Sequence, residues 1–180
     1  LNFDNEIDEF FLFSLFTDAQ IRFSALKKIT VAKTNQYYKD IDGVLYTKDG
    51  EALIYCPICN TGDEDGEIHI PDGVKYISSK AFAHNTGIKK LYLPDSLKLI
   101  FESAFSGMDE LQFVDFGKGI RHIGSENSPG VFRFCHKLKE VIIQEQVKSI
   151  GPNAFYNCSS LQQVKLPEGL EYISKYAFYG

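Results

Sequence analysis

The sequence lacks a continuous apolar stretch long enough to cross a membrane. Its longest apolar run, Phe10–Phe13, resumes after Ser14 for only two residues, whereas a membrane-spanning helix needs ~20 residues. No secretory signal opens the chain, which begins at Leu1 rather than Met. We therefore expect no membrane span in this chain, and the missing signal says nothing about localisation.

An excess of basic charge is missing as well. The 180 residues include 19 Lys and Arg against 24 Asp and Glu, a net charge of −5. Proteins that bind a nucleic-acid backbone present a basic stripe. The lysines here are spread along the chain, so we expect no nucleic-acid partner. A content of 44% hydrophobic and 24% charged residues is typical of a globular domain, or of one piece of a longer repeat array.

Motifs of catalysis and metal binding are scarce. The sequence contains no Gly-x-Ser-x-Gly, Walker-type or His-Glu-x-x-His pattern. Cys56 and Cys59 form a lone C-x-x-C, whereas a structural zinc site usually draws its four ligands from two such pairs. The acidic segment 61–72 has Thr61 and Asp72 where a calcium loop has Asp and Glu, which favours a solvated loop. We expect a non-enzymatic protein without metal or other cofactor, and free thiols at the C-x-x-C, with a local disulfide as the alternative.

What the sequence has in abundance is a repeat. Apolar residues recur 23 positions apart, in the pairs Ile77/Ile100, Phe82/Phe105, Phe132/Phe155, Phe155/Phe178, Cys135/Cys158 and Leu138/Leu161. One step, from Ile123 to Ile150, is 27, and its four extra residues fall in the polar stretch 125–130. An insertion confined to a loop, after which the apolar pattern resumes, is how stacked repeats tolerate changes of length.

Each repeat reads Ala-Phe-x-x-Cys-x-x-Leu-x-x-Val-x-Leu-Pro-x-x-Leu-x-x-Ile, most clearly from Ala154 onward. Its Leu-x-x-Val-x-Leu part places apolar side chains two apart, which predicts a short strand with one face buried. The predicted strands are 29–31, 68–70, 91–93, 114–116, 141–143 and 164–166. One unit cannot bury its apolar residues alone, so we expect the units to stack into a solenoid with a parallel sheet along one side and short strands or turns opposite.

This pattern resembles the BspA-type leucine-rich repeat family over residues 19–180, with Asn85 and Met108 in place of the Cys and Val131 in place of the Ala. The resemblance implies a β-rich α/β solenoid of about six coils, a right-handed superhelix with the sheet on its concave side. It also implies a bacterial cell-surface or secreted adhesion module. The implied ligand is a protein, such as a host extracellular-matrix or cell-surface protein.

Three regions depart from the regular array. Residues 1–18 read as an amino-terminal capping segment, with a helix predicted over 2–16 from its apolar spacing. Residues 32–67 interrupt the solenoid of residues 19–180. Two apolar runs there, 42–46 and 51–55, flank a turn that ends in Gly50 and predict a β-hairpin. We expect the hairpin to extend a coil, with a binding protrusion as the alternative.

The carboxyl-terminal segment 176–180 starts a repeat without its strand. The array is therefore expected to be incomplete there, with further repeats or self-association at this end.

The remaining cysteines and the histidines are interpreted as structural. Cys135 and Cys158 hold equivalent positions in adjacent repeats, and we expect them to be buried and reduced, since buried cysteine acts as a small hydrophobe. The histidines occupy different positions in the repeat and predict no column of metal ligands; they are His69, His84, His122 and His136.

The outward face of the predicted sheet is the candidate binding site. Residues before and between the inward pairs form two columns: Lys28, Glu67, Lys90, Phe113, Glu140 and Gln163, and Thr30, His69, Tyr92, Asp115, Ile142 and Lys165. Three apolar members fall on adjacent coils, and a contiguous exposed apolar set can mark an interaction site. The proposed set is Lys90, Tyr92, Phe113, Asp115, Ile142 and Lys165. The alternatives are that a loop covers the set, that the register is shifted by one residue, or that the chain is a structural spacer with its ligand site elsewhere.

Overall fold

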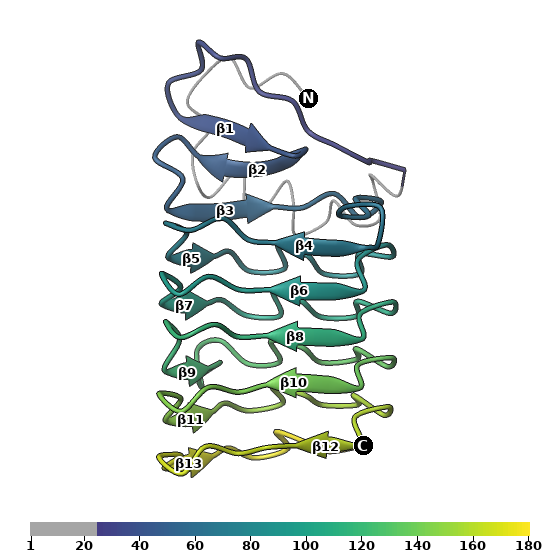
Figure 1. Cartoon of the computed structure of the whole chain (residues 1–180), viewed down its shortest axis with the longest axis vertical. Coiled ribbons are helices and arrows are strands. Elements are labelled where there is room, and N and C mark those ends of the chain that lie inside the picture. Colours follow the sequence, from purple (N-terminus) through teal and green to yellow (C-terminus); the bar gives the residue numbers. More distant parts are fainter. Residues whose placement is uncertain (1–24) are drawn as a thin grey trace.

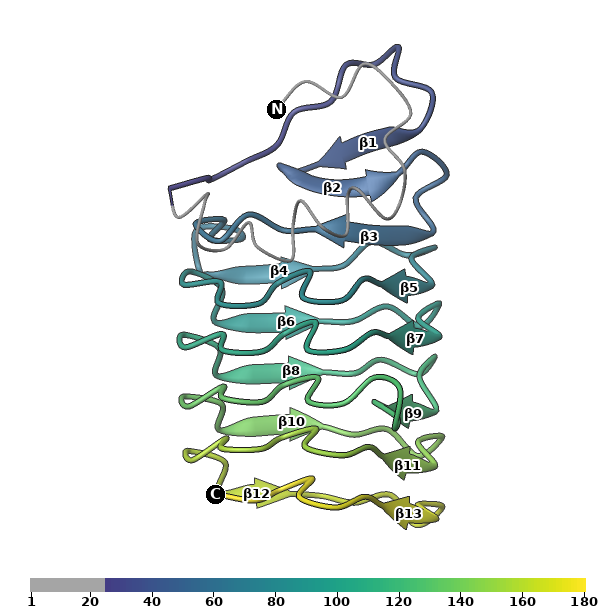
Figure 2. The ribbon, with the colours of Figure 1, turned by 180° about the vertical axis from the view of Figure 1, so that it is seen from behind.

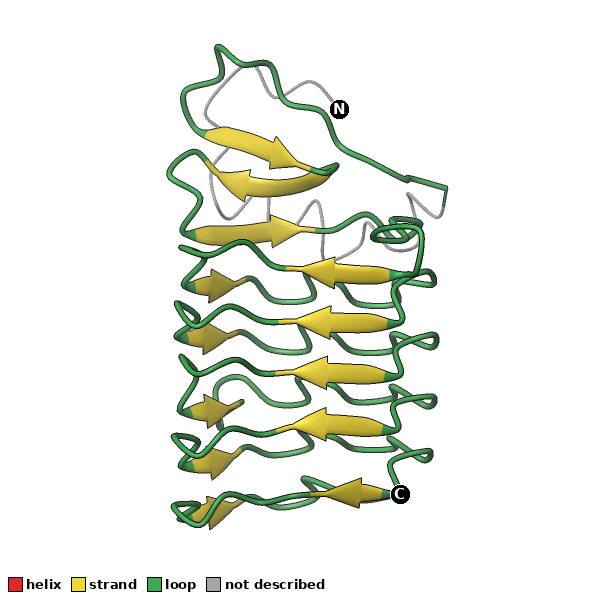
Figure 3. Cartoon of the chain, viewed as in Figure 1, coloured by secondary structure: helices red, strands yellow, loops and turns green. Residues whose placement is uncertain are grey.

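Residues 25–180, the part of the chain that the structure describes, wind into a stack of similar coils in the computed structural model (Figure 1). The strands are β1 (Tyr38–Ile41), β2 (Val44–Thr47), β3 (Ala52–Tyr55), β4 (Glu67–His69), β5 (Tyr76–Ile77), β6 (Lys90–Tyr92), β7 (Leu99–Ile100), β8 (Phe113–Asp115), β9 (His122–Ile123), β10 (Glu140–Ile142), β11 (Ser149–Ile150), β12 (Gln163–Val164) and β13 (Tyr172–Ile173). Within this range there is no helix (Figure 3). The architecture is a β-solenoid, and the helical part of the expected α/β class is not confirmed. The predicted helix over 2–16 and the capping segment 1–18 lie outside the described residues.

One parallel sheet runs along the coils below β3, in the order β12-β10-β8-β6-β4 (Figure 1). Its register aligns Glu67 with Lys90 and then with Phe113, and all of its pairings are parallel. The strands begin one residue earlier than predicted, because the outward residue ahead of the first buried position also joins the backbone ladder. The expected concave curvature is not confirmed, and the outer surface of this sheet is called the sheet face below.

The predicted strand 29–31 is the one that does not form. Ile29 and Val31 are buried, as their apolar character requires. However, the Ile29 N–H donates to the carbonyl of Gly43 at 2.8 Å, so this segment packs against the β1–β2 turn. Residues 29–31 therefore do not form a strand beside β4. The prediction from the sequence pattern was wrong here because the pattern does not show which segment a buried residue packs against.

A second side of the stack carries the short strands, which form two separate sheets (Figure 2). The first has the order β1-β2-β3-β5-β7 and the second β13-β11-β9. The break falls just before the four-residue insertion, where the Ser103 N–H donates to the carbonyl of Pro129 in the insertion. Two positions later the Phe105 N–H donates to Val131, so the stacking of coils resumes as the 27-residue step predicts.

The core is a column of phenylalanine rings, one from each Ala-Phe motif. Ring centroids lie 5.0 Å apart for Phe82 and Phe105, 4.7 Å for Phe105 and Phe132, 5.7 Å for Phe132 and Phe155, and 5.3 Å for Phe155 and Phe178. The planes of the last four rings are within 8° of parallel. Such stacking adds to the stabilisation from burying aromatic area, and it confirms the predicted Phe column.

The predicted hairpin forms between β2 and β3, which pair antiparallel. A further strand, β1, was missed: it pairs antiparallel with β2 through a turn at Asp42 and Gly43. Both turn residues have positive φ, 51° and 80°, which is the two-residue hairpin turn that Asp-Gly favours. Because β3 also pairs in parallel with β5, this three-stranded unit extends the second side of the solenoid.

Replacing Gly43 with Ala tests this turn. We expect a loss of about 2 kcal/mol in the free energy of unfolding, because an L-residue is strained at φ 80°. An added Cβ would also lie 2.5 Å from the Cβ of Lys28. Gly73→Ala is the matched control, since Gly73 has φ 97° and nothing within 4 Å of the added atom. Equal losses for the two variants in urea unfolding would contradict the close approach at Gly43.

Candidate functional site

The sheet face brings together most of the predicted binding residues. Lys90 and Tyr92 lie on β6, Phe113 and Asp115 on β8, and Ile142 on β10, in the register that the two columns required. The shifted-register alternative is therefore wrong. The sixth residue of the proposed set, Lys165, is exposed and follows the end of β12. At the other end of the two columns, Lys28 and Thr30 are exposed but belong to no strand.

An aromatic and apolar stripe crosses this face, formed by His69, Tyr92, Phe113 and Ile142. The rings of His69 and Tyr92 are stacked, with centroids 4.2 Å apart and planes 1° from parallel. The Phe113 ring lies 5.5 Å from that of Tyr92 at 50°. Ile142 is 37% exposed and follows on the next strand. The sequence analysis placed His69 in the second column but did not include it in the proposed binding set. Its position next to Tyr92 in that column could have indicated that it belongs to the site.

Charged groups frame the stripe. The Lys90 ammonium lies 2.5 Å from Glu67 Oε1, and this hydrogen bond raises the pKa of Lys90. Asp115 Oδ1 accepts hydrogen bonds from the Gly117 N–H at 3.0 Å and from Gln144 Nε2 at 3.2 Å. Glu140 is exposed and is the strand partner of Phe113. The stripe thus combines apolar side chains with hydrogen-bonded polar neighbours.

The cysteines contribute packing. Cys135 and Cys158 are buried free thiols, as expected for the repeat positions, and Cys56 of the C-x-x-C is a buried free thiol as well. The Cys135 thiol donates to the carbonyl of Phe105 and the Cys158 thiol to that of Phe132, at 3.1 and 3.2 Å. Burial raises the pKa values of Cys56 and Cys135 well above the ordinary range for a thiol, which keeps both groups protonated and unreactive.

Thiol labelling checks this arrangement. In the native protein at pH 8 we expect iodoacetamide to modify Cys59 first, because it alone of the four is not buried. Cys56, Cys135 and Cys158 should react only after unfolding in urea, since burial keeps the reagent away from all three thiols. Mass spectrometry of peptides from native and unfolded samples distinguishes the two classes. Rapid native labelling of Cys135 would contradict its burial.

Metal sites and membrane spans were also sought. Between residues 25 and 180, no group of three or more His, Cys, Asp or Glu side chains could hold a metal ion. Over the same range, no helix has the length and apolarity to cross a membrane.

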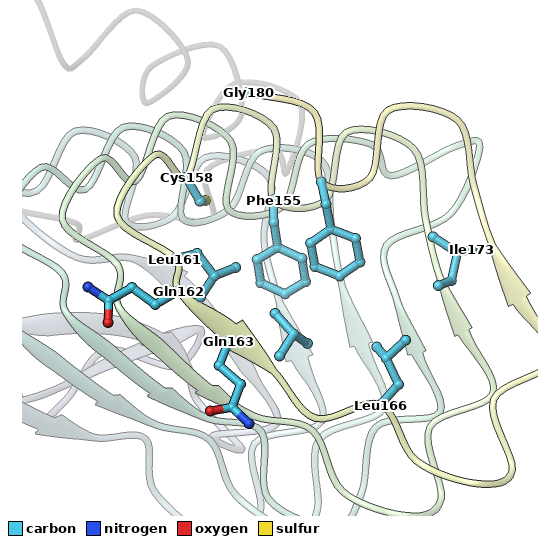
Figure 4. A pocket seen from close by; sticks show the side chains of 10 residues that line it. Phe155, Cys158, Leu161, Gln162, Gln163, Leu166, Ile173 and Gly180 are labelled. Carbon is cyan, nitrogen blue, oxygen red and sulfur yellow. The ribbon is translucent and has the colours of Figure 1, made fainter.

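A pocket of about 310 Å³ opens at the end of the stack that carries β12 and β13 (Figure 4). Its walls are apolar core residues of the last coil, with a few polar side chains: Phe155, Cys158, Leu161, Gln162, Gln163, Val164, Leu166, Ile173 and Phe178, together with Gly180. Apart from the Cys158 thiol, no titratable side chain lines it. The pocket is therefore an apolar opening between residues of the last coils.

Comparison with known proteins gives a sequence match and several structural ones. The sequence profile described as the BspA type leucine rich repeat region matches residues 64–180 in six copies. A leucine rich cell surface protein from Faecalibacterium prausnitzii superimposes with a TM-score of 0.76 at 30% identity, over 86% of this chain and 39% of that one. No curated protein matches this sequence.

Two other solved structures share the fold. The leucine rich repeat protein of T. pallidum gives a TM-score of 0.62 at 24% identity, over 82% of this chain and 66% of that one. The pneumococcal vaccine antigen PcpA gives 0.57 at 22% identity, over 84% and 46%. The chain thus spans about two thirds or less of the length of each of these three proteins.

Proposed function

Since the chain belongs to the BspA-type leucine-rich repeat family, we propose that it is a non-enzymatic protein-binding module that acts through its sheet face at the cell surface or outside the cell. The observation that carries this proposal is the stripe in which the rings of His69, Tyr92 and Phe113 contact one another in turn, with the exposed Ile142 on the next strand. Solenoids use extended surfaces of this kind for binding. The likeness to a leucine rich cell surface protein supports the proposed location.

The chemistry of the stripe favours a protein ligand. Tyr and Phe provide large contact areas at a low cost in side-chain entropy, and tyrosine is enriched at binding hot spots. Glu140 and Asp115 flank Phe113 and Ile142 on the neighbouring strands, and their charges limit which partners can approach. The proposed contact set is therefore Lys90, Tyr92, Phe113, Asp115, Ile142 and Lys165, extended by His69.

The test is binding by the wild type and by a triple variant, Tyr92→Lys, Phe113→Lys and Ile142→Lys. The ligands are a panel of purified extracellular-matrix and cell-surface proteins. We expect the triple variant to bind any ligand of the wild type at least about tenfold more weakly, because three apolar side chains of the sheet face are replaced by charged ones. Circular dichroism and thermal melting verify that the variant is folded.

The matched control changes Tyr76 and Tyr172 to Lys, two exposed tyrosines on the short-strand side of the solenoid. This variant should bind as the wild type does. Loss of binding by both variants would contradict the choice of the sheet face. If the wild type binds no protein in the panel, the result favours the alternative that the chain is a structural spacer.

A further inference from the structure

The Ala-Phe turn of each coil contains two positions with left-handed backbone. The residues directly before the Ala are Lys80, Ser103, Gly130, Asn153 and Tyr176, and those two after the Phe are His84, Gly107, Phe134, Asn157 and Gly180. All ten have φ between 53° and 103°. Gly and Asn adopt this conformation at low cost, whereas a bulky side chain is strained there by roughly 1–2 kcal/mol. The fold therefore prefers small residues at these positions.

Phe134 and Tyr176 go against that preference, as Lys80 and His84 do in an earlier coil, whereas Asn153, Asn157 and Gly180 follow it. The position directly after the Phe is not left-handed. It holds the small buried residues Ala83 and Ser106 in earlier coils, and Arg133, Tyr156 and Tyr179 in later ones. Arg133, Phe134, Tyr156, Tyr176 and Tyr179 all lie outside the Phe column, so packing of the core does not call for them.

These side chains form one continuous line of contacts, which we call the aromatic ribbon: Arg133, Phe134, Tyr156, Tyr179, Tyr176 and Lys175. Successive members lie 5.9, 5.6, 5.4, 5.6 and 4.7 Å apart, measured between ring centroids or from cation to ring. Tyr176 and Tyr179 are 51% and 57% exposed. A cation stands at each end, and neither Arg133 nor Lys175 forms an ion pair among the described residues. Beside the ribbon, His136 lies 6.2 Å from the Phe134 ring and 3.3 Å from Asp109 Oδ1.

The shape of the ribbon points to a linear polymer. It is a single line of four rings between two cations, and none of its members lines the pocket at the end of the stack. The backbone of these turns is already used between coils: the Phe134 N–H donates to Tyr156 and the Asn157 N–H to Tyr179, each at 2.7 Å. A peptide therefore cannot add to the ribbon as an extra strand. A nucleic acid would require a cation for most of its phosphates, and the ribbon has two on a chain of net charge −5.

We propose that the aromatic ribbon binds an acidic polysaccharide. The C–H faces of sugar rings pack on aromatic rings, whose faces carry partial negative charge. The tyrosine hydroxyls can bond sugar hydroxyls, and the sparse carboxylates or sulfates of such a chain pair with Arg133 and Lys175. This site lies on the turn side of the coils and is separate from the sheet face, so it does not depend on the protein ligand proposed above.

The test measures the dissociation constant for hyaluronan, which carries one carboxylate in each disaccharide, by calorimetry, with neutral dextran as the negative control. The double variant Arg133→Ser with Phe134→Gly restores the residues of the preceding coil, Ser106 and Gly107, and should remain folded. We expect it to bind hyaluronan about tenfold more weakly than the wild type. Tyr156→Ser, which changes no charge, should also bind more weakly.

Lys118→Ser is the control for charge alone, because it removes one exposed cation that is not part of the ribbon. It should bind hyaluronan as the wild type does. Binding of hyaluronan supports the proposal. The proposal is overturned if the wild type does not bind hyaluronan, if Lys118→Ser loses as much affinity as the double variant, or if Tyr156→Ser retains full affinity. Tighter binding of oligothymidylate or poly-glutamate than of hyaluronan also overturns it.

Discussion

Phe155→Ala should lower the free energy of unfolding by about 3–5 kcal/mol, the range for truncating a buried aromatic side chain. The ring is 1% exposed. It stacks between Phe132 and Phe178 at 5.7 and 5.3 Å and meets the edge of Phe116 at 6.3 Å. Its removal would leave a cavity that rigid coils above and below cannot fill, which adds to the lost transfer free energy. Urea unfolding followed by circular dichroism measures the change.

The same substitution at the end of the column is the control. Phe178 is 38% exposed and stacks on one side only, on Phe155. Phe178→Ala should therefore cost less than half as much as Phe155→Ala. A change below about 1 kcal/mol for Phe155→Ala would mean that the ring column does not hold the coils together.

Asn85→Cys is the second change with a large expected effect, and here the repeat pattern and the structure disagree. The pattern has Cys at this position, so the substitution looks like a return to the common residue. However, Asn85 is fully buried, and its Nδ2 donates to the carbonyls of Pro57 and Asn60 at 3.0 and 2.8 Å. Its Oδ1 accepts from the N–H groups of Gly87 and Ile88 at 3.0 and 2.9 Å.

A thiol can replace at most one of these four hydrogen bonds. The others would leave buried polar groups without partners, each at a cost of about 1–3 kcal/mol. We expect Asn85→Cys to destabilise the protein by about 2–4 kcal/mol in thermal or urea unfolding. The side chain joins the coil to the segment that carries Cys56 and Cys59, so this end of the solenoid should open first.

Met108→Cys tests whether the loss belongs to the hydrogen bonds. Met108 occupies the same repeat position and is fully buried, but its side chain has no polar group to satisfy. Met108→Cys should lower the free energy of unfolding by only about 1 kcal/mol, because the substitution only reduces the buried apolar volume. If both Cys variants lose the same stability, then the Asn85 network contributes nothing beyond packing.

The repeat spacing was sufficient to predict the coils, the Phe column and the insertion at 125–130, because each of these depends on apolar side chains that recur at fixed intervals. The hairpin between β2 and β3 followed from a different local signal, two apolar runs that flank a turn ending in Gly50. The outward columns of the sheet followed for the same reason: once the inward positions are known, the alternation along a strand assigns the others. The contact set on the sheet face and its ligand stay predictions.

The tertiary structure decided what spacing cannot encode. It placed residues 29–31 against the β1–β2 turn, showed that Asn85 bonds segment 57–60, and joined Phe134 to Tyr156 and Tyr179 across successive turns. Each of these contacts depends on which polar group or ring the neighbouring coil presents. Each also depends on backbone angles that several residue types can adopt at the same repeat position. The sequence determined that this chain is a stacked solenoid because burial depends on periodicity. The contacts between surface residues depend on how neighbouring coils are placed relative to one another, and only the folded structure shows this placement.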